Sequence, residues 1–479
     1  MQHIKDLLIK CGIKLESISE STLINFSENS DVKEAIETIA NTNSKIMEKW
    51  RVYEKISDFK NASISIPNGT QNAQYKYQFQ QGFMDAFELS HFAIVGLENV
   101  GLHFDEPSMC LSGVPQKGGD FDFDFIFKIL GDDANEQNRK TLKLVVNPDP
   151  KLLWKNLPSD KDAIYWKKDN ESAFGEFSDR SIVISSKRGR SHQNVGSFRD
   201  DHFSFKNLTE TGWSIAIVSD GAGSAPFSRE GSKLACEHFI EDFGNRMAGE
   251  EAKVLMNKFT EFASTKDESI SGDIEEFCKQ TLYKAAVNVY MKLEQFARGA
   301  KNKHKDSFEN YKAENPIELF HSTLCVVALK KIEMGYCILS FSVGDCPIGM
   351  LDKTRRQAKL LNWLDVGEFG GGTRFITQNQ IFHSKERPFA SRLTFDIIPS
   401  FSHIFLMTDG IYDPKFEVEA NLDQPNKWYE FLADLQGANE EDVKIDFSRD
   451  NKQLENELND WMDFWSRGNH DDRTLAIIF

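Results

Sequence analysis

Two aspartate-glycine dipeptides are the residues of this chain best suited to chemistry. Asp220-Gly221 and Asp409-Gly410 each close an apolar run, at residues 213–218 and 404–407. A carboxylate at the end of a buried strand is costly to desolvate unless a cation neutralises it, and a metal ion is the obvious candidate. Taken singly, each dipeptide is also a common turn pair, so the metal hypothesis depends on what accompanies them.

Two further acidic pairs frame these dipeptides. Asp200-Asp201 precedes the first run, and Asp471-Asp472 precedes the closing apolar run at residues 474–479. These carboxylates are spread over more than half of the chain, and no comparable cluster of histidine and cysteine accompanies them. Oxygen ligands suit Mg²⁺ or Mn²⁺ and argue against zinc or copper. The sequence therefore predicts a divalent-ion site built from strand ends that are distant in the chain.

The order and context of these segments resemble the metal-dependent Ser/Thr protein phosphatases of type 2C, the PPM family, over residues 181–479. The matching segments are residues 189–203, Asp220-Gly221-Ala222-Gly223 with Glu230-Gly231-Ser232, Ser322-Thr323-Leu324, Gly344-Asp345-Cys346-Pro347, Thr408-Asp409-Gly410 and Asp471-Asp472-Arg473-Thr474. Each segment alone is weak evidence, but six in the family's order are specific.

The resemblance implies an α+β fold, with a four-layer αββα sandwich, and hydrolysis of phosphoserine and phosphothreonine. It also implies two Mn²⁺ or Mg²⁺ ions, roughly 3.5–4 Å apart, which hold the phosphate and lower the pKa of a bridging water. Carried over by motif, Asp220 bridges the ions, the Gly221 carbonyl binds one, and Asp409 and Asp471 bind the other. Asp220, Asp409 and Asp471 are thus the implied catalytic residues.

Two departures from the family pattern affect the opening motif, which is residues 189–203, and the first dipeptide, Asp220-Gly221. Asp200 and Asp201 align with the family's acidic pair, and which of them coordinates, directly or through water, stays open. Many members place a histidine after the first Asp-Gly as a general acid, whereas this chain has Ala222. Protonation of the leaving group is then expected from water or from another side chain.

The phosphate-binding residue is also open, because the opening motif is longer than usual. Arg188, Arg190 and His192 are all candidates, and Arg190 and His192 are carried forward as the phosphate-binding pair. Gly344-Asp345 is expected to fix a turn rather than to bind metal. The glycine-rich residues 367–372 are expected to form a mobile flap near the cleft.

Length and composition limit the number of domains, the partners and the cellular location that can be expected. A chain of 479 residues exceeds one ordinary core, so two or three domains are expected. The net charge of −17 argues against nucleic acid or an anionic membrane as a partner. Seven cysteines without a C-x-x-C pair fit a reducing cytoplasm. Because no basic-then-apolar stretch opens the sequence and no apolar run approaches the roughly 18 residues of a membrane span, we expect a soluble cytoplasmic protein without a leader peptide.

The sequence of the N-terminal part predicts a helical region followed by a β region. Residues 1–60 carry apolar residues at helical spacing and are expected to form a docking or dimerising element. Residues 61–148 are expected to form a β-sandwich, since residues 120–125 alternate Asp and Phe strictly. The course of glycines and prolines over residues 101–121 resembles immunoglobulin-like, cadherin-like binding modules. Alternating aspartates could also suggest calcium, but they usually form the solvated face of a strand.

The remaining chain is divided between a linker and the phosphatase-like domain. Residues 149–177 are expected to be a linker that packs against a neighbour through its aromatic residues, and residues 178–479 form the domain. Apolar periodicity predicts a long helix over residues 274–296 and another over 254–262. Strands are predicted at residues 323–329, 336–343 and 403–407, and extra helices at 428–435 and 454–465.

Two functions are compatible with these observations. The first is a cytoplasmic, bacterial metal-dependent phosphoprotein phosphatase, whose partners are a phosphorylated protein substrate and a cognate Ser/Thr kinase. The second is a catalytically silent member of the same fold that acts as a regulatory or scaffold protein. The intact aspartate set favours the first function, and the missing histidine after Asp220-Gly221 keeps the second open.

Overall fold

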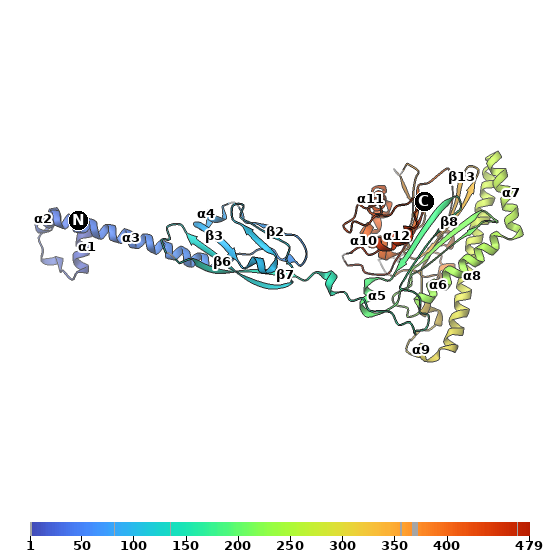
Figure 1. The fold of residues 1–479 in the computed structure, drawn as a ribbon, viewed down its shortest axis with the longest axis horizontal. Helices are drawn as coiled ribbons and strands as arrows, with labels where there is room; N and C mark the ends of the chain where they lie inside the picture. Colours follow the sequence, from blue (N-terminus) through green and yellow to red (C-terminus); the bar gives the residue numbers. More distant parts are fainter. Residues whose placement is uncertain (1, 81, 135, 355–356, 366–371, 467) are drawn as a thin grey trace. The chain divides into compact units, whose positions relative to one another are not determined.

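The chain forms two compact units, Met1–Leu153 and Trp154–Phe479. The computed structural model describes residues 2–80, 82–134, 136–354, 357–365, 372–466 and 468–479 (Figure 1). Within these ranges, no helix combines the length and the apolar character that crossing a membrane requires.

Helices begin the first unit. They are α1 (Gln2–Lys10), α2 (Glu20–Glu28) and α3 (Ser30–Asn61). The side chain of Ser19 caps α2 by accepting from the backbone N–H of Thr22, and Asn29 caps α3 in the same way. Phe59, near the end of α3, is 1% exposed because it packs into the β part that follows.

The described residues in the rest of the first unit form seven strands, the short helix α4 (Phe83–Ala86) and two 3-10 helices, Leu97–Val100 and Pro150–Leu153. One sheet has the order β1-β7-β6-β3 and the other β2-β5-β4. The strands are β1 (Gly69–Thr70), β2 (Tyr75–Gln78), β3 (Leu89–Val95), β4 (Leu102–Asp105), β5 (Cys110–Gly113), β6 (Gly119–Ile129) and β7 (Asn138–Asn147). In β6, Phe123, Phe125 and Phe127 are buried, while Asp122 and Asp124 are exposed. The predicted solvated aspartate face of this strand is therefore confirmed.

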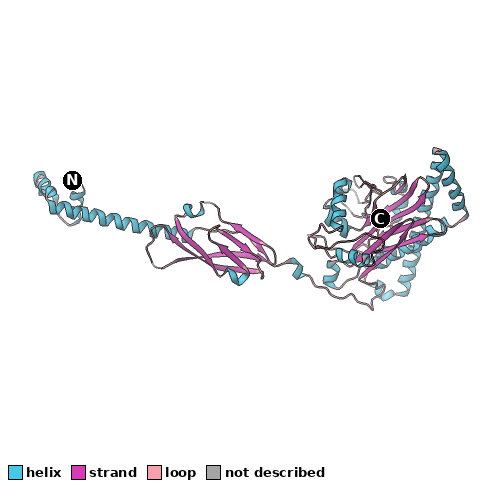
Figure 2. Ribbon diagram, turned by 45° about the horizontal axis from the view of Figure 1, so that its top comes forward, coloured by secondary structure: helices cyan, strands magenta, loops and turns pink. Residues whose placement is uncertain are grey.

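The second unit contains two antiparallel sheets, whose strands lie side by side in Figure 2. Their orders are β10-β11-β12-β13-β16 and β15-β14-β17-β18-β9-β8. The strands are β8 (Asn170–Phe177), β9 (Arg180–Lys187), β10 (His202–Leu208), β11 (Trp213–Ser219), β12 (Leu324–Ile332), β13 (Gly335–Val343), β14 (Ile348–Leu351), β15 (Ala358–Leu360), β16 (Leu393–Ile398), β17 (His403–Met407) and β18 (Arg473–Ile478). Every residue of β11, β13 and β17 is buried, which is why these strands read as continuous apolar runs.

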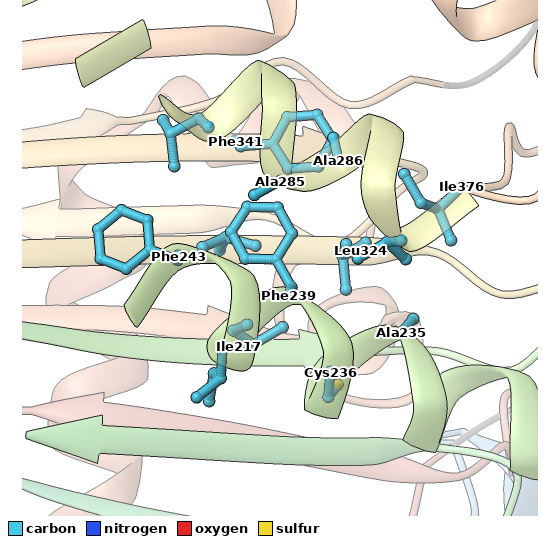
Figure 3. Close-up of a cluster of buried hydrophobic side chains, with 14 of the residues drawn as sticks. Ile217, Ala235, Cys236, Phe239, Phe243, Ala285, Ala286, Leu324, Phe341 and Ile376 are labelled. Atoms are coloured by element: carbon cyan, nitrogen blue, oxygen red, sulfur yellow. The ribbon is translucent and has the colours of Figure 1, made fainter. Parts of the chain in front are cut away.

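Helices pack against the two sheets of this unit. They are α5 (Arg190–Val195), α6 (Ser228–Met247), α7 (Glu250–Thr265), α8 (Glu268–Lys303), α9 (Lys305–Glu309), α10 (Asp409–Phe416), α11 (Pro425–Leu435) and α12 (Leu454–Trp461). One cluster joins α6 and α8 to the five-stranded sheet, where Phe239 stacks on Phe341 (Figure 3). Another joins α10, α11 and α12 to the six-stranded sheet, and a third contains side chains of both sheets. The mixed α+β fold is thus confirmed.

The expected linker over residues 149–177 differs from the structure at its C-terminal end. Asn170–Phe177 is strand β8, which pairs with β9 at the edge of the six-stranded sheet. Most of its residues are only half-buried, and it includes the small residues Ser172, Ala173 and Gly175. An edge strand of this kind lacks the apolar run that identifies a central strand, so its sequence reads as a polar connector.

Candidate metal centre

Strand β11 delivers the first predicted ligand, Asp220, to the end of the five-stranded sheet. The backbone N–H of Asp220 donates to Thr323 Oγ1 at 2.8 Å, and the Thr323 N–H donates to the Asp220 carbonyl at 2.8 Å. A side chain on Gly221 would place its Cβ 2.6 Å from the Asp200 carbonyl oxygen. Only glycine allows the opening motif to lie this close to the Asp220-Gly221 turn.

Strand β17 delivers the second predicted ligand, Asp409, which begins helix α10. The backbone of Asp471-Asp472 crosses Gly410 so closely that a Cβ there would overlap the Asp472 carbonyl. A Cβ on Gly189 would overlap the Asp471 backbone in the same way. The two acidic segments and the opening motif therefore converge because glycines leave room for their backbones.

Asp201 is buried between two threonines. Its Oδ2 accepts hydrogen bonds from Thr408 Oγ1 at 2.9 Å and Thr474 Oγ1 at 2.7 Å. Burial, followed by repulsion from Asp472, raises the pKa of Asp201 to about 7, although both threonine hydrogen bonds act to lower it. The threonines hold the Asp201 carboxylate in one orientation and leave its Oδ1 available to a cation.

Asp472, in contrast, is fully engaged by the protein. Its Oδ1 accepts from the Gly189 N–H at 2.6 Å and from His192 Nδ1 at 2.9 Å, and its Oδ2 accepts from the Asp200 N–H at 2.5 Å. Burial alone would raise the pKa of Asp472, but His192 and these hydrogen bonds lower it. Asp472 therefore links the closing segment, residues 471–474, to the opening motif. The carboxylate of the neighbouring Asp471 is exposed and makes fewer contacts with the protein.

His192 lies among carboxylates. Its Nε2 is 3.9 Å from Asp200 Oδ2 on the side opposite the Asp472 hydrogen bond. Burial lowers the pKa of His192, but Asp472, Asp200 and Asp471 outweigh burial and raise it to about 10. The imidazole is thus a cation near neutral pH, with an N–H directed toward Asp200. Burial and repulsion from Asp472 raise the pKa of Asp200 itself to about 7.

Asp220 and Asp409 have the most strongly perturbed carboxylates of the group. Burial is the main cause that raises the pKa of each well above its ordinary value. Repulsion from Asp409 adds to it for Asp220, and repulsion from Asp471 adds to it for Asp409. No Lys or Arg among the described residues pairs with the carboxylates of Asp201, Asp220, Asp409 or Asp471. A group of closely spaced carboxylates that no described Lys or Arg neutralises fits a divalent cation.

The carboxylate of Asp345 also belongs to this group. Ligand atoms of Asp220, Asp345 and Cys346 lie within 4.8 Å of one another, as do those of His192, Asp471 and Asp472. Asp345 Oδ1 is buried and makes no hydrogen bond with a described residue, whereas Oδ2 accepts from Thr373 at 2.6 Å. Gly344 does form the expected turn, with a φ of +105°, but the sequence did not reveal that Asp345 faces Asp220.

The basic residues of the opening motif are placed in different directions. Arg190 donates to the Asp463 carbonyl at 2.6 Å and lies over the Trp465 ring. Arg188 is buried and donates to the backbone carbonyl of Ser197 at 2.8 Å. Of the three candidates for phosphate binding, only His192 lies beside a predicted metal ligand, with its Nε2 3.9 Å from Asp200 Oδ2. The predicted flap lies outside the described residues, except for Gly372.

Lys167 is a functional candidate that sequence reasoning missed. Its buried Nζ donates to the Asp201 carbonyl at 2.6 Å, the Arg229 carbonyl at 3.1 Å and the Asp200 carbonyl at 3.3 Å. Burial, together with repulsion from Arg199, lowers the pKa of Lys167 to about 7, against the attraction of Asp200 and Asp201. A lysine in a polar segment is ordinarily solvated, so nothing in the sequence marks this one.

Lys167 belongs to a strap, residues 154–169, which arginines of the domain hold by its backbone. Arg188 Nη2 donates to the Leu157 carbonyl at 2.8 Å, and Arg229 Nη2 donates to the Ile164 carbonyl at 2.8 Å. Arg199 Nε donates to the Lys168 carbonyl at 3.0 Å. Hydrogen bonds from charged donors are stronger than neutral ones, so the strap is a fixed support behind Asp200-Asp201.

A family model described as Protein phosphatase 2C matches residues 188–463. The comparison with curated proteins found no match. Among similar solved structures, a bacterial serine phosphatase is 13% identical, with 62% of this chain and 96% of that chain covered and a TM-score of 0.32. The serine-threonine phosphatase 2C from Toxoplasma gondii is 11% identical (65% and 98% covered, TM-score 0.35), and the S. agalactiae serine/threonine phosphatase is 14% identical (65% and 99% covered, TM-score 0.33).

Proposed function

The chain belongs to the protein phosphatase 2C family, and from that premise we propose that it is a metal-dependent phosphatase of phosphoserine and phosphothreonine in proteins. One observation carries the proposal. The ends of β11 and β17 and the segment before β18 bring together Asp220, Asp409 and Asp471, whose pKa values are raised by desolvation and by repulsion from neighbouring carboxylates. Such a group is unfavourable by itself and is stabilised by divalent cations.

We propose that two Mn²⁺ or Mg²⁺ ions bind there. Asp220 would bridge them, the Gly221 carbonyl would bind one, and Asp409 and Asp471 the other. Asp201 is the better ligand of the opening pair because its threonine partners orient it. Divalent ions in such a site neutralise phosphate oxygens and lower the pKa of a coordinated water toward neutrality.

The chain's own residues supply the remaining steps. His192, held by Asp472, keeps a proton on the nitrogen that faces Asp200. It is placed to donate a hydrogen bond to a phosphate oxygen or a proton to the departing serine oxygen, in place of the histidine that Ala222 replaces. Asp472 orients the imidazole, as a carboxylate does for a catalytic histidine. Lys167 and the strap hold the backbone that carries Asp200 and Asp201.

The decisive experiment measures hydrolysis by the purified full chain. With Mn²⁺, we expect turnover of p-nitrophenyl phosphate and of a phosphoserine peptide, and we expect chelation to abolish both. The second candidate, a catalytically silent scaffold, is favoured by Ala222 alone. It would be established by calorimetric binding of Mn²⁺ without turnover of either substrate.

The three apolar clusters support a four-layer αββα sandwich, and the two-sheet β part of residues 61–148 supports an immunoglobulin-like binding module. The domain proper would begin at residue 178, with β8 and the strap added before it. We also propose a cytoplasmic, bacterial setting and a cognate Ser/Thr kinase that supplies the phosphorylated substrate.

A further inference from the structure

Helix α3 carries a stripe of large apolar side chains that face solvent. Ile39, Ile46, Trp50 and Tyr53 are 37%, 59%, 61% and 70% exposed. They are spaced by seven, four and three residues, which is the a/d pattern of a heptad repeat rather than a scatter of surface residues. In this register Val32, Ile39, Ile46 and Tyr53 occupy d, and Ile36, Asn43 and Trp50 occupy a.

The opposite face of α3 is already occupied by the first unit. Ile56 and Phe59 pack into the aromatic core of the β part, Lys55 pairs with Glu88, and Lys140 Nζ donates to the Phe59 carbonyl at 2.7 Å. At 3.6 residues per turn, Lys55 and Phe59 lie nearly half a turn from the stripe and Ile56 about a quarter turn from it. The β part therefore fixes the helix while leaving the stripe uncovered.

We propose that α3 pairs in parallel with α3 of a second copy of this chain, as a two-stranded coiled coil. The seam runs from Val32 to Tyr53, and Met47, 54% exposed, flanks it at position e. Each apolar side chain of the seam would enter a space between four residues of the facing helix. This inference goes beyond phosphatase activity and does not depend on it.

Asn43 identifies the partner and the orientation. It lies at position a in the middle of an otherwise apolar seam. In a parallel homodimer two such asparagines face one another and can hydrogen-bond, which favours two strands in one register at some cost in stability. Any other apolar partner would leave the Asn43 amide buried without a matching group.

The charges beside the seam agree with a parallel homodimer. Lys49 lies at position g and Glu54 at position e of the next heptad. In a parallel pair, g of one helix faces the following e of the other, so Lys49 and Glu54 form two symmetry-related attractive pairs. Over the whole helix six acidic and six basic residues balance, so α3 lacks the cationic excess that would favour an anionic membrane surface.

The first turns of α3 contribute less to the seam. Helix α2 contacts α3 there, and Val32 and Ile36 are half-buried. The part from Ile39 to Tyr53 is about two heptads, so we expect a reversible dimer whose population depends on concentration.

The test is the mass of the full chain in solution, measured by sedimentation equilibrium up to about 100 μM, where even weak pairs form. We expect twice the chain mass. Ile46→Asp should give the monomer mass, because it places two carboxylates in the seam. Asn41→Asp adds the same charge at the outward position f of the same helix and should leave the dimer intact. A monomer for the unchanged protein would overturn the proposal, and so would a trimer.

Orientation is tested separately. Lys49→Glu alone should weaken the dimer at least tenfold, and Lys49→Glu with Glu54→Lys should restore it, because only the parallel arrangement pairs these positions. Tyr53→Cys in a Cys11→Ser background should cross-link with a short bismaleimide, since the remaining cysteines are buried. Glu48→Cys, at position f, is the matched control and should not. Cross-linking at position 48 rather than 53 would overturn the proposed seam.

Discussion

In the β part of the first unit, Phe79, Phe92 and Phe125 lie in contact and are at most 2% exposed, whereas at the candidate metal centre of the second unit Asp201 is buried equally deeply. Each buried phenylalanine stabilises the fold by about 1.5–3 kcal/mol without help from any ligand. Buried carboxylates destabilise it unless they are paired. The first interior therefore needs no ligand, whereas the second, on the proposed function, is stabilised by bound cations.

The largest expected effect concerns Asp220 and Asp409. Asp220→Asn or Asp409→Asn should reduce Mn²⁺-dependent hydrolysis of p-nitrophenyl phosphate more than about 100-fold, since loss even of an indirect support of a metal ligand costs 10–100-fold. Without metal each variant should melt higher than the unchanged protein, because repulsion among the carboxylates is relieved.

The matched control is Asp122→Asn on the exposed face of β6, which should alter neither activity nor melting. Retention of more than about a tenth of the turnover by both metal-centre variants would contradict the ligand assignment.

The next effect tests the strap. Lys167→Met removes a buried amine that donates hydrogen bonds to three carbonyls, so Asp200 and Asp201 should lose their alignment and kcat should fall about 10–100-fold. Thermal melting measured beside the kinetics separates misalignment from unfolding. Lys161→Met, in the same segment but exposed, should be silent. Unchanged kcat in a folded Lys167→Met protein would remove the strap from the site.

A moderate effect is expected at His192. Removing its proton should slow departure of the poorly leaving serine oxygen, whereas p-nitrophenolate needs little proton assistance. His192→Ala should therefore slow phosphoserine peptide hydrolysis tenfold or more beyond its effect on the aryl phosphate. His192→Gln, which retains a donor for Asp472, controls for loss of that contact. Equal slowing of both substrates would indicate phosphate positioning instead of proton donation.

The fourth prediction concerns pH and metal removal. The pKa values of Asp200 and Asp201 are raised to about 7 in the folded, metal-free protein, above the roughly 4 of an unfolded chain. Between these values the folded state binds protons that the unfolded state has lost, so stability must fall as pH rises. We expect the metal-free melting temperature to drop by about 5 °C or more from pH 5 to pH 7.

Metal should reverse this loss. Saturating Mn²⁺ should raise the melting temperature strongly at pH 7 and weakly at pH 5, because protonated carboxyls bind metal poorly. An equal Mn²⁺ shift at both pH values, or metal-free melting that rises over this window, would show that the carboxylates are not a repelling group.

The smallest effect is expected from removing the self-sufficient unit altogether. A chain that begins at Trp154 retains the strap and every proposed ligand, so its hydrolysis of p-nitrophenyl phosphate should stay within about twofold of the full chain. A chain that begins at Asn170 lacks the strap and should lose most of the activity. Loss of activity in a soluble, folded chain from Trp154 would show that the first unit contributes to the site.

The sequence could predict those elements whose signal lies within a short stretch of chain. Strand β17 has the predicted bounds of residues 403–407, because a strand buried on both faces is a continuous apolar run. The edge strand β8 and the buried Lys167 carry no such signal. Asp345 faces Asp220 only because two strands of the fold bring them together, and the sequence carries no signal of that approach. Arg190 is held away from the carboxylates by its contacts with the Asp463 carbonyl and the Trp465 ring, and these contacts could not be predicted from the sequence.

Gly189, Gly221 and Gly410 restrict which substitutions the metal centre can accept during evolution or engineering. At each of these positions a single methyl group would collide with the backbone of a segment that carries an aspartate. An acidic ligand can be exchanged for a similar donor while the chain path is kept, but none of these glycines can be replaced without moving two segments at once. The candidate centre therefore requires these three glycines as much as it requires the carboxylates, and we expect the least sequence variation at the glycines.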